Sequence, residues 1–325
     1  MRNKELFLMS CLFAAFDICH RSHSPLCSLF QIPKPTKIQV KIAQLILSPL
    51  LNANAKNFRQ SFPQRQHAFS PMKNIYFLSD AHLGSLAIPH ARTQERRLVN
   101  FLDSIKHKAD AIYLLGDIFD FWHEYKYVVP KGYTRLLGKI SELTDMGVEV
   151  HFFTGNHDLW VHDYFEKECG MTIHRQSTTL EIYGKVFYLA HGDGLGSTDR
   201  SFRFLRSVFH NATCQRLFAA LHPRWGMAFG LEWARRSRMK RVDGKEPEYQ
   251  GEDNEELIRF AKDYLSTHPD INYFIFGHRH IELDLMLSRT TRAIILGDWI
   301  TEFSYAVFDG EHMLLEEFVE GETQP

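Results

Sequence analysis

The sequence has few cysteines and no long apolar run. Five cysteines occur in 325 residues, and three of them (Cys11, Cys19 and Cys27) precede residue 30, which leaves Cys169 and Cys214 for the rest of the chain. This distribution offers no disulfide framework and fits a reducing compartment. No stretch approaches the roughly 18–20 consecutive apolar residues that a membrane-spanning helix needs.

The chain also has no excess of charge of either sign. The chain carries 38 Lys or Arg and 39 Asp or Glu, for a net charge of −1, and it shows no internal repeat or low-complexity segment. The near-neutral total argues against a protein that binds nucleic acid through overall charge. With 44% hydrophobic and 24% charged residues, the length allows one large globular domain or two small ones.

The first 71 residues differ from the remainder. Residues 6–16 form a short apolar stretch behind Arg2 and Lys4, but no cleavage site of small residues follows closely, and residues 56–71 show no helix or strand period. Met72 lies three residues before the first expected strand. We therefore expect residues 1–71 to be a leader that contributes nothing to the fold, disordered or arising from a mis-assigned start. An export signal is the alternative.

Five short apolar runs are each followed by residues that bind metals. The residues that follow are Asp80-Ala81-His82, Gly116-Asp117, Gly155-Asn156-His157-Asp158, His191-Gly192-Asp193 and Gly277-His278-Arg279-His280. Runs of four to six β-branched and aromatic residues bounded by Gly are typical of buried strands. Side chains at the carboxyl ends of parallel strands converge in one crevice. A site of Asp, His and Asn without Cys suits divalent ions such as Mn²⁺, Fe²⁺ or Zn²⁺.

Single examples of such residues carry little weight. A lone Gly-Asp after a strand is usually a turn, and we expect Gly297-Asp298, which follows the apolar run 293–296, to be one. A lone histidine such as His151 or His174 is more often packed or exposed than ligating. Five such endings in this order are not explained by chance.

The five-part pattern resembles the calcineurin-like metallophosphoesterases, from Met72 to about Phe318. The resemblance implies an α/β four-layer sandwich, in which two mixed β-sheets are flanked by helices, and a site for two divalent metal ions. It assigns one ion to Asp80, His82 and His280, the other ion to Asn156, His191 and His278, and a bridging position to Asp117. A shared carboxylate would offset the repulsion between two cations roughly 3.5–4 Å apart. Neutral imidazoles would fill other positions without adding charge.

The remaining periodicity fits this fold, in a main domain of residues 72–320. Amphipathic spacing predicts helices over residues 98–105, 133–143 and 257–264. Apolar runs after His280 predict strands over residues 283–287, 293–296, 304–308 and 313–318.

A segment from about residue 195 to 251 separates the fourth and fifth ligand blocks and shows no convincing strand. Residues 200–245 contain eleven Lys or Arg against two acids, interleaved with Phe and Trp. The pattern predicts a helical insertion, either a solvated hairpin packed on the core or a cap over the metal site. A cap would offer cations to phosphate and apolar surface to an acyl chain or bilayer. The candidate substrate-binding residues of this cap are Phe209, Trp233, Arg236, Lys240 and Arg241.

Two metal ions flanked by Asn and His indicate a phosphoryl-transfer hydrolase. Asn156 would stabilise charge on the phosphoryl oxygens, and His157 would face the leaving group. In related phosphatases an acid matching Asp120 orients the histidine of the Gly-Asn-His block. We therefore expect an Asp120–His157 pair, with His157 as general acid or charge stabiliser. Simple packing is the alternative for His157.

Further motifs are similar to those of the UDP-2,3-diacylglucosamine diphosphatases of lipid A synthesis. These motifs are Gly-Asp-x-Phe-Asp-x-Trp (116–122), His-Gly-Asp-x-Leu (191–195) and a helical cap before Gly-His-x-His. The resemblance implies hydrolysis of the UDP-linked glycolipid to UMP and 2,3-diacylglucosamine 1-phosphate. It also implies Mn²⁺ as the metal and a cytoplasmic protein held peripherally at the inner membrane, with no stable nucleic acid partner.

One residue departs from that family. Its best-known branch has Arg after the Asn, and this chain has His157. A metal-dependent phosphodiesterase or nuclease of the same superfamily, with the cap gripping nucleic acid, is therefore an alternative. A non-catalytic scaffold is a third class, disfavoured because none of the expected ligands is missing.

Overall fold

The computed structural model describes residues 73–88, 91–196, 206–242 and 248–321, with the backbone alone for 240–242. The expected leader, residues 1–71, lies outside the described residues.

The first sheet has six strands in the order β11-β10-β1-β2-β3-β4. Strands β1 to β4 run parallel to one another, and β10 and β11 add antiparallel pairs beside β1. The strands of this sheet are β1 (Asn74–Leu78), β2 (Ala109–Leu114), β3 (Glu149–Phe153), β4 (Thr172–His174), β10 (Ser304–Phe308) and β11 (Met313–Glu317).

The second sheet has five strands in the order β5-β6-β7-β9-β8. Its three central strands, β6, β7 and β9, are parallel, and the edge strands β5 and β8 are antiparallel to their neighbours. The strands are β5 (Thr178–Ile182), β6 (Lys185–Ala190), β7 (Tyr273–Phe276), β8 (Leu283–Met286) and β9 (Arg292–Ile295).

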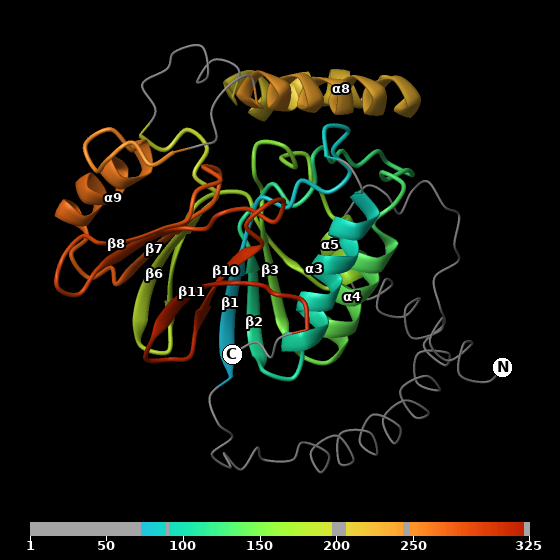
Figure 1. Ribbon diagram of the computed structural model, residues 1–325. Coiled ribbons are helices and arrows are strands. Elements are labelled where there is room, and N and C mark those ends of the chain that lie inside the picture. Colours follow the sequence, from blue (N-terminus) through green and yellow to red (C-terminus); the bar gives the residue numbers. More distant parts are fainter. Residues whose placement is uncertain (1–72, 89–90, 197–205, 243–247, 322–325) are drawn as a thin grey trace, which may run out of the picture. The chain divides into compact units, whose positions relative to one another are not determined.

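Helices cover the outer faces of both sheets (Figure 1). Helices α3 (Ala91–Ile105), α4 (Thr134–Asp145) and α5 (Tyr164–Cys169) pack on the six-stranded sheet, and α9 (Glu256–Thr267) packs on the five-stranded sheet. The position of β1 explains why residues 75–78 are all apolar. Ile75 and Phe77 enter the core between the sheets, whereas Tyr76 and Leu78 face the helices. A strand covered on both faces needs no polar side. The predicted α/β sandwich is confirmed.

The helices and strands expected from periodicity correspond to α3, α4, α9 and β8 to β11. The pattern missed α5, β4 and β5. Helix α5 has six residues and β4 has three, which is too short for a period to show. Strand β5 is an edge strand with alternating exposed side chains.

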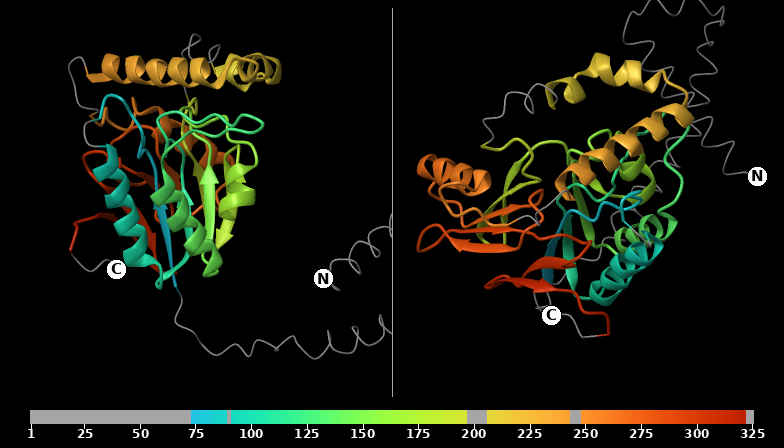
Figure 2. Two further views of the ribbon diagram at one scale, coloured as in Figure 1. Left: turned by 90° about the vertical axis from the view of Figure 1, so that its right-hand side faces the viewer. Right: turned by 45° about the horizontal axis from the view of Figure 1, so that its top comes forward.

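The insertion between the ligand blocks is helical in its described part. We use the term cap for residues 206–242, which contain a short helical stretch at 206–210, α7 (Ala212–Ala219) and α8 (Pro223–Val242). Figure 2 shows α8 lying across the loops at one end of the strands. A Cβ atom at Gly226 would overlap the Tyr125 hydroxyl, and one at Gly230 would overlap the Phe121 ring. Glycine therefore permits the close approach of α8 to these loops. No helix in the described part is both long and apolar enough to span a membrane.

Candidate metal centre and cap pocket

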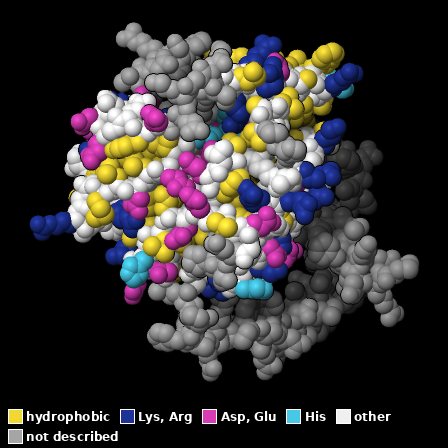
Figure 3. All heavy atoms as spheres, viewed as in Figure 1, with side chains coloured by type: hydrophobic (Ala, Val, Ile, Leu, Met, Phe, Trp, Pro, Cys, Tyr) yellow, Lys and Arg dark blue, Asp and Glu magenta, His cyan; other side chains and the backbone are white. Residues whose placement is uncertain are grey.

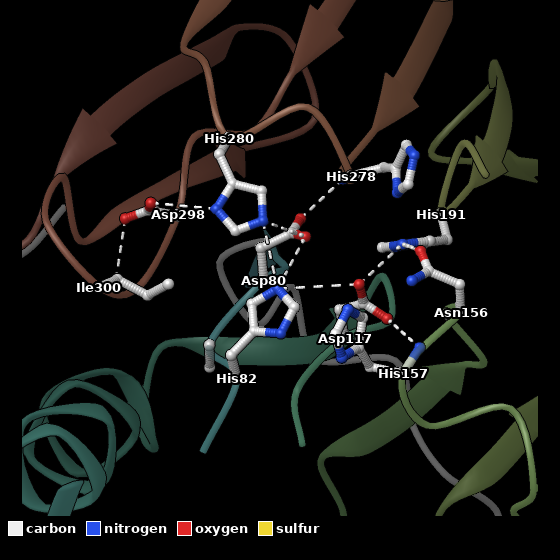
Figure 4. A network of polar contacts seen from close by, with 12 residues as sticks. Asp80, His82, Asp117, Asn156, His157, His191, His278, His280, Asp298 and Ile300 are labelled. Carbon is white, nitrogen blue, oxygen red and sulfur yellow. Dashed lines mark hydrogen bonds and ion pairs between the residues drawn. The ribbon is translucent and has the colours of Figure 1, made fainter. Parts of the chain in front are cut away.

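The expected ligands meet because the strands that carry them end at one edge of the two sheets. Asp80 and His82 follow β1, and Asp117 and Asn156 follow its parallel neighbours β2 and β3. From the second sheet, His191 follows β6 and the pair His278 and His280 follows β7. Figure 4 shows these side chains directed toward one another.

The backbone turns sharply at most of these residues. Five expected ligands adopt a left-handed backbone, with φ between 44° and 69°: Asp80, His82, Asp117, His278 and His280. Asp and His tolerate this region better than most residues, yet each such residue still costs about 1–3 kcal/mol. Gly155 and Gly277 leave room for the carboxylates of Asp117 and Asp80, which a Cβ would meet.

The buried carboxylate of Asp158 holds two of the ligand blocks together. It accepts backbone N–H groups from Gly155 and Ile118, both at 2.8 Å, and from Asp117 and Phe119, both at 3.2 Å. These bonds connect the turn after β2 to the turn after β3. The sequence analysis gave Asp158 no role, although it ends the Gly-Asn-His-Asp block.

The first metal-binding group consists of Asp80, His82 and His280. Asp80 Oδ1 lies 3.3 Å from His280 Nε2 and 3.6 Å from His82 Nε2, and the two Nε2 atoms are 3.2 Å apart. Asp80 Oδ2 accepts the backbone N–H of His278 at 2.7 Å. One carboxylate oxygen is therefore anchored and the other faces two imidazoles.

The second group consists of Asp117, His191 and His278, with Asn156 beside it. Asp117 Oδ2 lies 3.3 Å from His191 Nε2 and 3.7 Å from His82 Nε2, so one oxygen faces both groups. Asn156 Oδ1 is 3.3 Å from His191 Nε2. The position of Asp117 between the groups is the one that a bridging carboxylate requires.

These separations fit two divalent ions. Ligand atoms at about 2.0–2.2 Å from one ion lie roughly 3.0–3.6 Å from one another. The contacts of 3.2–3.7 Å among Asp80, His82, His280, Asp117 and His191 fall in or near this range. An all-oxygen-and-nitrogen set suits borderline divalent metals. The described residues can therefore hold divalent cations.

Three histidines are oriented through the ring nitrogen that points away from the ligand cluster. His191 Nδ1 lies 2.8 Å from the carbonyl of Leu115, and His280 Nδ1 lies 3.2 Å from Asp298 Oδ2. His82 Nδ1 faces Asp120 Oδ1 at 3.4 Å. Such partners fix the tautomer and leave Nε2 free for a metal.

Asp298 is thus more than the turn residue expected from the sequence. It contacts His280, and its Oδ1 accepts the backbone N–H groups of Ile300 and Thr301 at 2.8 and 2.7 Å. The signal that could have found it is its position, because β9 is parallel to β7 and Asp298 follows β9 at the same edge.

Opposite charges in this cluster stabilise one another. Burial alone would raise the pKa of Asp80, but the His280 and His82 imidazoles hold it well below its ordinary value. Burial would lower the pKa of His280, yet Asp80 and Asp298 raise it to about 9. The same balance against Asp117 raises the pKa of His191. The raised histidine pKa values thus reflect the negative charge of the buried carboxylates, which bound cations would also offset.

Asp120 and His157 are in contact, chiefly through the main chain of Asp120. His157 Nδ1 lies 2.8 Å from the backbone carbonyl of Asp120 and 3.9 Å from its carboxylate. That carboxylate is fully buried and pairs with Arg238 Nη2 at 3.0 Å. Asp120 therefore orients His157 through its main chain. Burial lowers the pKa of His157 to about 4.

A cavity of about 280 Å³ opens beside Asn156 and His157. Its walls are largely aromatic and come from the cap and from the loops after β2 and β3. The aromatic residues that line it are Phe121, Trp122, Trp160, Phe209, Phe218, Phe229 and Trp233. The structure thus places Phe209 and Trp233, two of the candidate cap residues, at a cavity that reaches the candidate catalytic residues.

Comparison with known families agrees with this geometry. Residues 73–282 match the model of the calcineurin-like phosphoesterase family. The chain belongs to the calcineurin-like phosphoesterases. The matched range includes all the candidate ligands, from Asp80 to His280.

Two curated relatives carry the same name, UDP-2,3-diacylglucosamine hydrolase. The chain is 50% identical over 252 residues to a UDP-2,3-diacylglucosamine hydrolase of Porphyromonas gingivalis, which covers 74% of this chain and 96% of the relative. It is 30% identical over 233 residues to a UDP-2,3-diacylglucosamine hydrolase of Neisseria meningitidis, covering 72% and 92%. Among solved structures, a dimetal phosphatase from Danio rerio matches at 14% identity and a TM-score of 0.39, covering 76% of this chain and 96% of that one.

In this phosphoesterase, the arginines of the cap that contact the ligand loops are not the ones expected from the sequence. Arg236 is largely exposed and pairs with Glu232 on its own helix at 2.7 Å, so the structure does not place it at the cavity. The side chains of Lys240 and Arg241 lie outside the described residues. Arg238 reaches Asp120 instead, and Arg206 pairs with Asp193 at 2.8 Å.

Three ion pairs connect the cap and its return to the ligand blocks. Arg206 meets Asp193 after β6, Arg238 meets Asp120 after β2, and Glu255, directly before α9, meets Arg279 between the two histidines after β7 at 2.6 Å. In each of these three pairs, the residue from the ligand block is not itself a candidate ligand. The position of the cap is therefore coupled to the loops that carry the metal ligands.

Proposed function

We propose that this protein hydrolyses the diphosphate of UDP-2,3-diacylglucosamine to UMP and 2,3-diacylglucosamine 1-phosphate, a step of lipid A synthesis. The observation that carries the proposal is the aromatic cavity that opens at Asn156 and His157, directly beside the metal-binding groups. A diphosphate with acyl chains needs charge-stabilising groups and apolar surface side by side. The two relatives named for this substrate support the same conclusion.

The proposed cofactor is a pair of divalent ions, with Mn²⁺ as the metal. Asp80, His82 and His280 would hold one ion, Asn156, His191 and His278 the other, and Asp117 would contact both. When bound, the ions would polarise the phosphoryl oxygens and activate water at neutral pH.

The residues of the chain position the reacting phosphate. Asn156 lies at the second metal-binding group and also lines the cavity, so its amide can reach a phosphoryl oxygen. His157 lines the same cavity with Nδ1 held by the Asp120 carbonyl. The charge of a bound phosphate would favour the protonated ring, which would then donate from Nε2 to the leaving phosphate. Asp120 acts through His157 and His82 as a positioning residue.

The cavity and the outer surface of the cap would hold the lipid. Phe209, Phe229 and Trp233 offer apolar surface to acyl chains. Trp225 on α8 and Leu217 on α7 are both 67% exposed, and Figure 3 shows hydrophobic and basic side chains together in the region of α8. We therefore place the protein peripherally at a cytoplasmic membrane surface, where such mixed surfaces bind.

An assay of the Mn²⁺-loaded protein tests this function. We expect release of UMP from UDP-2,3-diacylglucosamine, with a much lower kcat/KM for a deacylated analogue, because the analogue leaves the aromatic cavity empty. Bis-p-nitrophenyl phosphate and single-stranded DNA serve as comparison substrates. Efficient cleavage of DNA together with inactivity on the glycolipid would refute the proposal and favour the nuclease alternative.

A further inference from the structure

A second cavity of about 320 Å³ adjoins the first and reaches the metal-binding group at His191. It is bounded by the ends of β3 and β6, the connection from β4 to β5, and the start of the cap. His191, a candidate ligand, forms part of its wall, and Asp193, Arg206 and His210 line both cavities. Of the pair in contact at 3.3 Å, His191 lines the second cavity and Asn156 lines the first, so the place expected for the reacting phosphate lies between the two cavities.

The lining of this second cavity is polar and cationic. Thr154, Gln176 and Ser177 supply hydroxyl and amide groups that donate and accept hydrogen bonds. Arg175 and Arg206 supply positive charge, and Asp193 is the one carboxylate among the described residues that line the cavity. Such a wall suits an anionic ligand rich in hydrogen-bonding groups and does not suit an acyl chain.

Two aromatic rings, those of His174 and Phe153, also line this cavity. His174 stacks on Phe153 with ring centroids 4.4 Å apart and an angle of 12° between the planes. Ring surfaces of this kind pack well against nucleobases.

We propose that the second cavity is the subsite for the nucleoside 5′-monophosphate half of the substrate, a pyrimidine nucleotide. The assignment rests on the proposed function, which supplies a substrate with a nucleotide on one side of the scissile bond and acyl chains on the other. The substrate then spans the metal site, with UMP on the His191 side and the acylated sugar phosphate on the His157 side. A cavity of this size is at the small end of ligand sites, which suits one half of a large substrate.

Filling the second cavity tests the assignment. Gln176 is exposed, and Gln176→Trp places an indole in the cavity without removing buried packing. Thr179→Trp is the matched control, because Thr179 is an exposed residue of the adjoining edge strand β5 and does not line the cavity. Gln176→Ala removes the amide without adding bulk. The probes are UMP, measured by titration calorimetry, and both reaction products, measured as inhibitors.

We expect Gln176→Trp to weaken UMP binding by about tenfold or more, which corresponds to about 1.4 kcal/mol. Inhibition by 2,3-diacylglucosamine 1-phosphate should change less than about twofold, because this product is expected in the other cavity and the substitution should cost it far less than about 1.4 kcal/mol of binding free energy. Gln176→Ala should weaken UMP binding to a smaller extent, and Thr179→Trp should alter neither product.

Unchanged UMP affinity in Gln176→Trp, or equal losses for both products, would overturn the subsite while leaving the proposed function intact. A wild-type protein that neither cleaves the glycolipid nor binds UMP would overturn both.

Discussion

At the scale of single residues, Asp117 has two tasks. Its Oδ2 faces His82 and His191, one from each metal-binding group, and its Oδ1 accepts the backbone N–H of His157 at 2.8 Å. The same carboxylate therefore connects the two metal-binding groups to the segment that carries the candidate catalytic residues. Asp158 in turn fixes the backbone of Asp117.

Replacing Asp117 should remove metal and turnover together. Two cations that lose their shared counter-charge repel each other, and several kcal/mol of charge stabilisation depend on them. We expect Asp117→Ala to lower the rate by roughly a hundredfold or more and to reduce metal content as measured by plasma mass spectrometry. Asp270→Ala, at an exposed carboxylate, is the control. An Asp117→Ala protein with two metals and a near-normal rate would show that the bridging assignment is wrong.

The positions of the candidate ligands could be predicted from sequence because all of them follow one of five strands. The apolar run identifies the strand, and parallel pairing brings the strand ends together. The partners that orient the ligands were harder to find. Asp298 belongs to a Gly-Asp pair like many turns, and only the parallel pairing of β9 with β7 brings it to His280. Strand pairing depends on residues far apart in the sequence, so a local sequence pattern does not predict it.

At the scale of elements, helix α8 reverses the usual rule for amphipathic helices. Among residues 223–239 of α8, whose side chains the structure describes, the buried residues are small and spaced by four: Gly226, Gly230 and Ala234. The large residues at the same spacing, Trp225, Phe229 and Trp233, are about half exposed or more. Large apolar residues normally mark the packed face. The sequence analysis therefore chose Arg236 and Arg241 among the cap arginines and passed over Arg238, although Arg238 continues the small-residue stripe by one further step of four.

That stripe predicts different roles for two neighbouring arginines. Arg238→Met leaves the buried Asp120 carboxylate without its cation, which should cost on the order of 3 kcal/mol. We expect a lower melting temperature or a loosened cap, and a higher KM for the glycolipid. Arg236→Met is the matched control on the same helix, because an exposed pair contributes at most about 1 kcal/mol. Similar losses in both variants, measured by thermal unfolding and steady-state kinetics, would contradict the assignment.

The exposed aromatic residues of the cap should govern membrane binding. Trp225→Ser removes a side chain that is 67% exposed, and burying such a side chain in a bilayer surface contributes at least about 1.5 kcal/mol. We expect co-sedimentation with anionic phospholipid vesicles to weaken by about tenfold. Met286→Ser on β8, 57% exposed and outside the cap, should bind vesicles as the wild type does. Equal vesicle binding by the wild type, Trp225→Ser and Met286→Ser would show that the cap does not bind the membrane.

At the scale of the whole molecule, the metal centre exists only when both sheets are assembled. Asp80, His82 and Asp117 follow strands of the six-stranded sheet, whereas His191 and His280 follow strands of the five-stranded sheet. The core between the sheets, which includes Phe77 of β1 and Phe187 of β6 with stacked rings 5.7 Å apart, fixes their separation. Metal binding should therefore report on the packing of the complete domain.

The last prediction concerns which part of the chain makes up that domain. The family match begins at residue 73, and the Porphyromonas relative aligns over 96% of its own length with 74% of this chain. We therefore expect a chain that begins at Met72 to unfold at the same temperature and to turn over the glycolipid at the same rate as the full chain.

Vesicle binding gives this comparison a second readout. If the cap is the membrane-binding surface, the shortened chain should sediment with vesicles as the full chain does. If the apolar residues 6–16 are the anchor, it should lose vesicle binding while keeping its melting temperature. A fall of several degrees in melting temperature would instead mean a loss of more than about 1 kcal/mol in the free energy of unfolding. Residues 1–71 would then contribute to the fold, and the expectation drawn from their missing periodicity would be wrong.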